Sequence, residues 1–131
     1  MAKVCSSNVK ISGLAYIYTK ANKMYVCAGQ PADQAGAAAT ATNKIASWSM
    51  TTGTGTDYQL EATGTGMKII VDAQASLVPD ATVVADHIAL ACSSAGSTEL
   101  IYVTTCGTQL ITSTANKINV SSWTITIGDA T

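Results

Sequence analysis

The chain has little charge and lacks several residue types. It contains no arginine and no phenylalanine, one histidine and two prolines, and only 11% of its 131 residues are charged. The seven lysines are scattered and the formal net charge is -1. Because proteins that bind nucleic acid neutralise phosphates with clustered Arg and Lys, this composition argues against a nucleic-acid partner.

Long apolar runs are also absent. A membrane span needs roughly 18 to 20 apolar residues, and the apolar runs here are interrupted within a few residues. The first ten residues, MAKVCSSNVK, lack the apolar core of a signal peptide. We therefore expect synthesis in the cytoplasm, no membrane partner, and one domain over residues 1–131, with residues 1–22 as an N-terminal segment.

Alanine, threonine, serine and glycine dominate, and hydrophobic residues still reach 47%. Threonine and valine favour strands. Alanine and glycine permit close approach of backbones. A weakly charged surface of this kind favours contact with other chains, so the composition indicates a protein that packs against neighbours.

Two kinds of local pattern occur in the first half of the chain. Residues 7–20 place apolar side chains near helical spacing behind a cap at Ser7 or Asn8, although a period of two also fits part of the segment. Residues 23–29 are typical of a strand. Residues 32–43 are a low-complexity stretch that we expect to be an exposed, mobile loop.

From residue 44 onward the pattern is that of strands. Apolar and polar residues alternate in residues 44–50, 57–63 and 67–73, and a tight TGTG turn separates the last two. Residues 81–92 and 98–106 form a predicted hairpin joined by SSAGS. Residues 108–113 and 118–129 complete a set that places Trp48 and Trp123 on core faces.

These elements predict a mainly β protein. The expected fold is an antiparallel β-sandwich of 7–8 short strands with one short N-terminal helix, and a jelly roll is one topology that fits. Periodicity does not choose the topology.

The candidate reactive residues do not form a recognisable site. Strand alternation puts His87 and Cys92 on opposite faces, and Cys106 on the face of Leu100 and Tyr102. The four cysteines (Cys5, Cys27, Cys92, Cys106) lie at least fourteen residues apart, unlike the close ligand pairs of structural zinc. Cys27 and His87 could meet in space, but no motif of a cysteine enzyme surrounds them. We expect no metal, no cofactor and no enzymatic activity.

Several segments resemble, in the same order, a family of small virion proteins of tailed bacteriophages. The resemblance runs from about Met24 to Thr131. The residues that carry it are Cys27, Gln30, Pro31, Ala85, Asp86, His87, Leu100, Tyr102, Val103, Thr104, Thr105, Cys106, Trp123, Ile125 and Asp129.

The resemblance implies a capsid decoration or cement protein on the exterior of the virion. Its partners would be the major capsid protein and neighbouring copies of itself, as a homo-oligomer on the capsid. A tail or fibre component that attaches to a host surface is the alternative. The expected contact residues are in the N-terminal segment and on a polar strand face: Val4, Val9, Ile11, Leu14, Thr124 and Thr126. We further expect Cys5 to be accessible and Cys92 to be buried.

Overall fold

The computed structural model describes residues 6–39, 43–64, 66–94 and 96–127. Within them the order of elements is α1 (Ser7–Lys20), β1 (Lys23–Cys27), α2 (Gln34–Ala38), β2 (Lys44–Ser49), β3 (Tyr58–Ala62), β4 (Met67–Val71), β5 (Gln74–Leu77), β6 (Val84–Ser94), β7 (Ser97–Leu110), β8 (Ile118–Val120) and β9 (Trp123–Ile127). The protein is therefore mainly β, as the sequence predicts.

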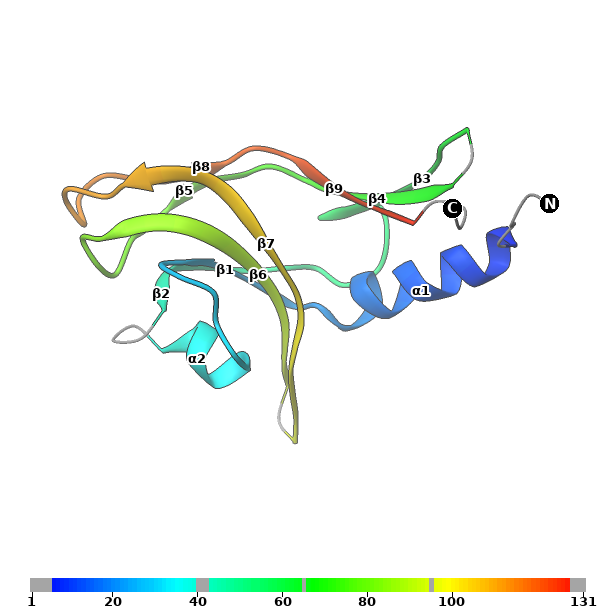
Figure 1. Cartoon of the computed structure of the whole chain (residues 1–131), viewed down its shortest axis with the longest axis horizontal. Helices are drawn as coiled ribbons and strands as arrows, with labels where there is room; N and C mark the ends of the chain where they lie inside the picture. Colours follow the sequence, from blue (N-terminus) through cyan, green and yellow to red (C-terminus); the bar gives the residue numbers. More distant parts are fainter. Residues whose placement is uncertain (1–5, 40–42, 65, 95, 128–131) are drawn as a thin grey trace.

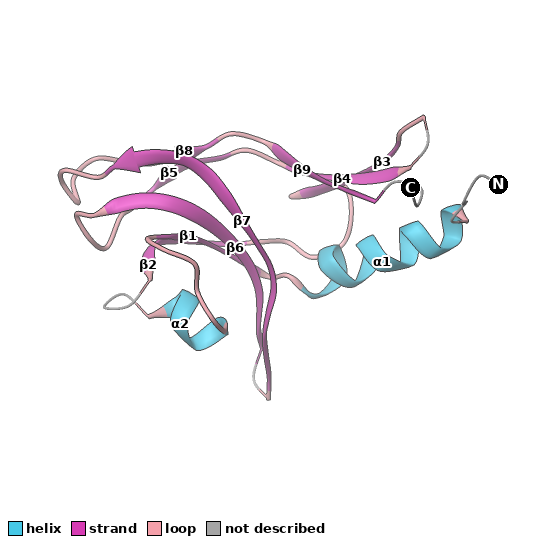
Figure 2. Ribbon diagram, viewed as in Figure 1, coloured by secondary structure: helices cyan, strands magenta, loops and turns pink. Residues whose placement is uncertain are grey.

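The strands form antiparallel sheets in a sandwich-like arrangement. One layer is a four-stranded sheet of order β2-β1-β6-β7. The pair β5-β8 lies above it, and the three-stranded sheet β3-β4-β9 continues this upper layer end to end with that pair, over α1 (Figure 1). Helix α1 lies under β3 and β4, and α2 lies on the far side of the four-stranded sheet (Figure 2).

The four-stranded sheet is covered on both faces. Its inner face carries large side chains, such as those of Met24, Val26 and Leu90, into the main core between the layers. Its other face carries Ala89 and Ala91 into a smaller cluster under α2. Alanine on that face lets the short helix approach the sheet closely.

The predicted N-terminal helix is confirmed. Ser6 is its N-cap, where its hydroxyl accepts a bond from the Val9 backbone N–H at 3.3 Å, so the cap lies one residue before the predicted position. Leu14 is fully buried in the main core. The helix ends at Lys20, and the buried Tyr58 hydroxyl donates a bond of 2.7 Å to the carbonyl of Ala21 just beyond it.

Helix α2 corrects the expectation of a loop over residues 32–43. Asp33 caps it by accepting a bond of 2.7 Å from the Gly36 N–H, and Ala37 is fully buried against the sheet. Residues 40–42 lie outside the described part of the chain. Five residues rich in alanine give no apolar periodicity, so the sequence pattern did not show the helix.

The predicted hairpin is confirmed, but its second strand is longer than expected. Strand β7 runs on through Leu110, so residues 108–110 continue it and the predicted separate strand 108–113 was wrong. The pairing also slips twice. Ile101 is an extra residue between the pairs Leu90–Tyr102 and Ala91–Leu100, and three residues, Cys106–Thr108, lie opposite one residue of β6. Such bulges bend and twist a strand pair.

The bulge at Ile101 overturns the prediction that Leu100, Tyr102 and Cys106 share one face of the strand. Cys106 and Tyr102 pack against the main core, whereas Leu100 packs against the cluster under α2. Trp48 is a second correction, because it is 37% exposed rather than on a core face. The alternation of β9 is confirmed, since Ile125 is buried and Thr124 and Thr126 are exposed.

Candidate functional site

Cys27 and His87 do come together. They are paired positions on neighbouring strands β1 and β6, so their side chains leave the same face of the sheet. The imidazole Nδ1 of His87 lies 2.7 Å from the carboxylate of Asp86. The same carboxylate oxygen accepts a bond of 2.8 Å from the Gly29 N–H. A carboxylate, an imidazole and a thiol are thus grouped at the start of β6.

The electrostatics of this group oppose nucleophilic chemistry. Burial, with the nearby Asp86 charge as a second cause, raises the pKa of the Cys27 thiol to about 12. Cys106 also has a raised pKa, mainly through burial. A cysteine nucleophile needs a depressed pKa because the thiolate is the reactive form. This arrangement keeps both thiols protonated.

Metal ligation has no geometric basis in residues 6–39, 43–64, 66–94 and 96–127. No group of three or more His, Cys, Asp or Glu side chains there is placed to hold an ion. Cys27, Cys92 and Cys106 are free thiols. Cys92 is 5% exposed, so its predicted burial is confirmed, and Cys5 lies outside the described residues.

A concavity lies between β7 and the segment that leads through β8 into β9. It is an open cavity of about 480 Å³. Its apolar lining comes from Val26, Ala85, Ile88, Ile111, Ile118 and Val120. The other lining residues are Thr104, Thr105, Cys106, Gly107, Gln109, Asn119, Ser121, Ser122, Trp123 and Thr124, and none of the lining residues is charged. A volume of this order is that of a small-molecule site, roughly 300 to 1,000 Å³.

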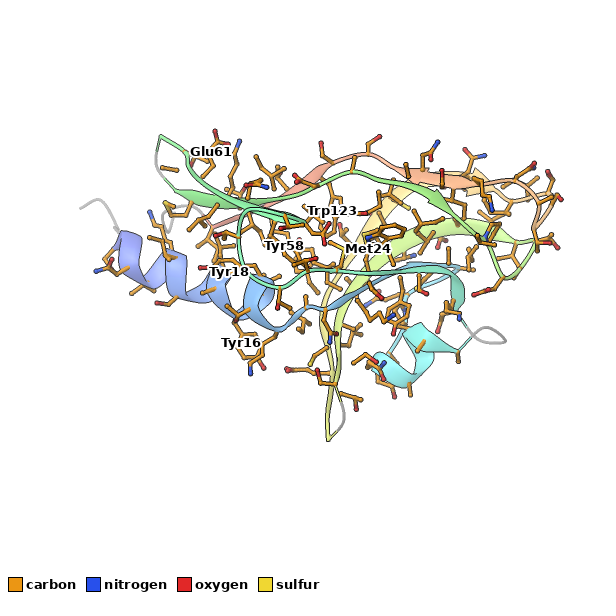
Figure 3. All side chains as sticks on the ribbon, turned by 180° about the vertical axis from the view of Figure 1, so that it is seen from behind. Tyr16, Tyr18, Met24, Tyr58, Glu61 and Trp123 are labelled. Atoms are coloured by element: carbon orange, nitrogen blue, oxygen red, sulfur yellow. The ribbon has the colours of Figure 1, made fainter. Side chains whose placement is uncertain are left out.

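Trp123 is one of the residues that line this cavity, and its indole N–H lacks a hydrogen-bond partner among the described residues. Its ring stacks on Tyr102 with centroids 6.0 Å apart and planes at 24°. Its indole Nε1 is buried and has no hydrogen-bond partner among the described residues. Figure 3 shows Trp123 between the layers, on the side of the upper sheet. A buried indole N–H usually has an acceptor, so this group is an exception within the fold.

The outer edge of β7 is a second exposed feature. β7 is the last strand of its sheet, and none of the strands described pairs with its other edge. Glu99 is its sole charged residue, and the Tyr16 hydroxyl donates a bond of 2.5 Å to it. No side chain described from residue 98 to residue 110 is buried.

An apolar rim lies at the far end of the same hairpin. Val84 and Leu110 are paired positions, 40% and 59% exposed, and Val83 beside them is 36% exposed. The Val83 carbonyl accepts a bond of 3.0 Å from the Ile111 N–H, which closes this end of the sheet. We call Val83, Val84 and Leu110 the apolar rim.

The contact residues predicted from sequence do not form one surface. Val9 is 62% exposed and Ile11 is half-buried on α1, but Leu14 is fully buried and therefore unavailable to a partner. Thr124 and Thr126 are exposed on β9. Val4 lies outside the described residues.

The sequence analysis missed the cavity and the apolar rim. Both depend on contacts between segments that are distant in the chain. One local signal was present, since SSWT places three hydroxyl residues around Trp123. That signal alone does not say which other strand faces the tryptophan.

Comparison of the chain with models of protein families, with curated proteins and with solved structures finds no match in any of the three. The resemblance to phage virion proteins stays a prediction. Neither helix of the described chain is long and apolar enough to cross a membrane.

Proposed function

We propose that this protein is an accessory component of a bacteriophage virion that binds the outside of the assembled capsid and cements neighbouring capsid subunits. Its partners are the major capsid protein and adjacent copies of itself. The observation that carries the proposal is the outer edge of β7, a long strand with a single hydrogen-bonded neighbour and almost no charge.

Such an edge favours contact with another chain. Unpaired N–H and C=O groups offer hydrogen bonds to an approaching strand, and monomeric proteins usually guard them with lysine, proline or inward charges. From Leu100 to Leu110, β7 contains no charged residue and no proline. The edge therefore has no charge and no proline as a guard from Leu100 to Leu110, and only the bulges at Ile101 and Cys106–Thr108 interrupt it.

The apolar rim extends the same surface. Val84 and Leu110 expose aliphatic side chains at the end of the hairpin, where a partner can bury them together with the strand edge. A specific interface buries roughly 1,600 Å² in total. Repetition over a lattice raises the effective concentration, so each contact can be weak while the layer as a whole stays attached.

The decisive measurement is the position of the protein in an intact particle. We expect a three-dimensional reconstruction to show it on the capsid exterior, and we expect capsids that lack it to lose heat resistance. Density confined to the tail would overturn the proposal in favour of the alternative, a tail or fibre component that attaches to a host surface. Unchanged heat resistance of the depleted capsid would overturn the cementing role.

Paired charge substitutions then locate the contact. Leu110→Glu places a charge on the apolar rim, and Val9→Glu places one on α1, where the exposed fraction is similar at 62%. Added back to depleted capsids, Leu110→Glu is expected to bind about tenfold more weakly or worse, because a buried unpaired charge is costly. Val9 is among the contact residues predicted from sequence, so this variant sets that prediction against β7: if β7 makes the contact, Val9→Glu binds like the parent. The reverse result would place the contact on α1 and overturn the assignment to β7.

A further inference from the structure

We propose that the straight part of the β7 edge, Tyr102–Thr105, pairs antiparallel with the same segment of a second copy of the chain. The two four-stranded sheets then form one continuous sheet across a two-fold axis. This inference rests on the β7 edge as the contact surface proposed above, and it names the chain that occupies that edge. The capsid protein then contacts the apolar rim.

The two bulges of the β6–β7 hairpin delimit this straight part. Between them the ladder pairs follow one another without a slip, from Leu90–Tyr102 to His87–Thr105. In a regular antiparallel ladder, alternate residues of the outer strand turn their N–H and C=O groups away from its partner. Those groups are free to continue the ladder with another strand. Beyond Thr105 the second bulge bends the strand, so the apolar rim lies off this line.

Charge favours a partner strand of the same kind in the antiparallel direction. Glu99 is the sole charged residue of β7. A parallel pair of β7 strands in register would place two Glu99 side chains next to each other, and like charges on facing positions destabilise a strand pair. An antiparallel pair centred within Tyr102–Thr105 places them at opposite ends. Because no other charge lies on the strand, two identical edges can meet without repulsion.

The cavity is continuous with this edge and adds apolar surface to the contact. Thr104 and Thr105 belong to its lining, and it lies where the lower layer ends in β7 and the upper layer ends in β8 and β9. At the other edge of the four-stranded sheet, β2 contacts β5. A second copy laid along β7 covers the mouth of the cavity. It removes part of the apolar lining from water, and no charge in the lining opposes that burial.

Sedimentation equilibrium of the isolated protein tests the pairing. Because the straight part of the edge is short, we expect a monomer–dimer equilibrium with a Kd on the order of 10 µM. No larger species is expected, since a two-fold contact uses the same surface of both copies and closes on itself. Amide hydrogen exchange then locates the contact. Peptides that cover Tyr102–Thr105 should exchange more slowly at about twentyfold above the Kd than at about tenfold below it.

Three variants separate a strand contact from a general effect of charge. Thr105→Lys places a lysine on the exposed edge, which opposes strand pairing, and should weaken the dimer about tenfold or more. Thr105→Val is β-branched and uncharged, so it should dimerise like the parent. Thr52→Lys adds the same charge at an exposed threonine in the loop after β2 and should also dimerise like the parent. Circular dichroism confirms that each variant is folded.

Four results would overturn the inference. A protein that stays monomeric up to about 1 mM has no such contact. A Thr105→Lys dimer as tight as that of the parent would place the contact on another surface. Equal weakening by Thr52→Lys would make the effect one of charge alone. Species that grow beyond the dimer would show an open-ended contact instead of a two-fold one.

The outcome is distinguishable from failure of the proposed function. A parent protein that is monomeric in solution but cements capsids would overturn the pairing of β7 with itself and leave the capsid role intact. A dimer that forms through β7 while the protein lies on the tail would keep the pairing and overturn the capsid role.

Discussion

Strands β6 and β7 belong to one hairpin, yet they are buried to opposite extents. Residues 88–92 of β6 are all buried, whereas no side chain described between residues 98 and 110 of β7 is. The difference follows from sheet order. β6 has β1 on one side and β7 on the other, while β7 has only β6. The inner strand is buried in the fold, and the outer strand has one edge that none of the described strands pairs with.

Composition follows the same division. Within β6, Ile88 and Leu90 enter the main core, and Ala89 and Ala91 fit under α2. Within β7, three of the seven residues after Val103 are threonine, and Gly107, Gln109 and Leu110 are exposed. Hydroxyl-bearing β-branched residues keep strand propensity without requiring burial. β7 thus contributes partly buried side chains, such as those of Tyr102 and Leu100, where β6 contributes fully buried ones.

The strongest test of this division is truncation of a leucine in each strand. Leu90→Ala should lower the free energy of unfolding by about 2 to 5 kcal/mol, because it opens a cavity in the core. Leu110→Ala on β7 should change it by no more than about 0.5 kcal/mol, since its side chain is 59% exposed. Denaturant titration of both variants makes the comparison. Equal losses would contradict the assignment of β7 as a surface strand.

An enlargement tests the other face of β6. Ala89→Leu should cost about 1 to 3 kcal/mol, because Ala89 is fully buried in the cluster under α2 and the space there is filled. Thr108→Leu on β7 is its control, since Thr108 is exposed. Thermal unfolding followed by circular dichroism measures both. An Ala89→Leu variant as stable as the parent would mean that α2 does not pack firmly on the sheet.

The parts of the fold that could be predicted from sequence are those with a local pattern. Alternation in β3, β4 and β9 predicted which residues face the core, and the turn residues predicted the β3–β4 and β6–β7 hairpins. Ile69 and Val71 are fully buried, in agreement with that pattern. In these strands one face is buried and the other is not, so a period of two is visible in the residues themselves.

Other parts depend on contacts that no local pattern contains. Strands β5 and β8 have four and three residues, too few to show a period, and they form a sheet only with each other. The bulge at Ile101 moves Leu100 to the opposite face from the one that simple alternation predicts. The cavity exists because residues 104–109 and 118–124 approach each other across the sandwich. The sequence contains these two segments, but no local pattern predicts that they come together in the fold.

The thiols offer a smaller effect that compares the two strands directly. Cys92 of β6 is 5% exposed, Cys27 beside β6 is fully buried, and Cys106 of β7 is partly exposed. We expect iodoacetamide to modify Cys106 before Cys27 in the native protein, as measured by peptide mass spectrometry. With a pKa of about 12, roughly one Cys27 thiol in 10⁴ is ionised at pH 8, so burial and protonation both slow its reaction.

The same experiment tests the prediction that Cys5 reacts before Cys92. Denatured protein is the control, because all four thiols should then react at similar rates. Modification of Cys27 or Cys92 ahead of Cys106 in the native state would mean that β6 opens to solvent more readily than β7, against the comparison of the two strands.

The smallest expected effect is a pH dependence at Asp86, where the bulge of β7 faces β6. The hydrogen bond with His87, and then the bond from the Gly29 N–H, hold the pKa of this carboxyl below its ordinary value. A carboxyl whose pKa is lower in the folded state adds stability above its unfolded pKa of about 3.9, and that stability is lost as pH falls through the folded pKa. The parent should therefore lose stability below about pH 4.

Asp86→Asn cannot ionise, so it should be slightly less stable at neutral pH and should lose less on acidification. Denaturant titrations at about pH 7 and about pH 3 measure the difference. Identical acid losses in parent and variant would show that this carboxylate does not tie the start of β6 to the turn after β1.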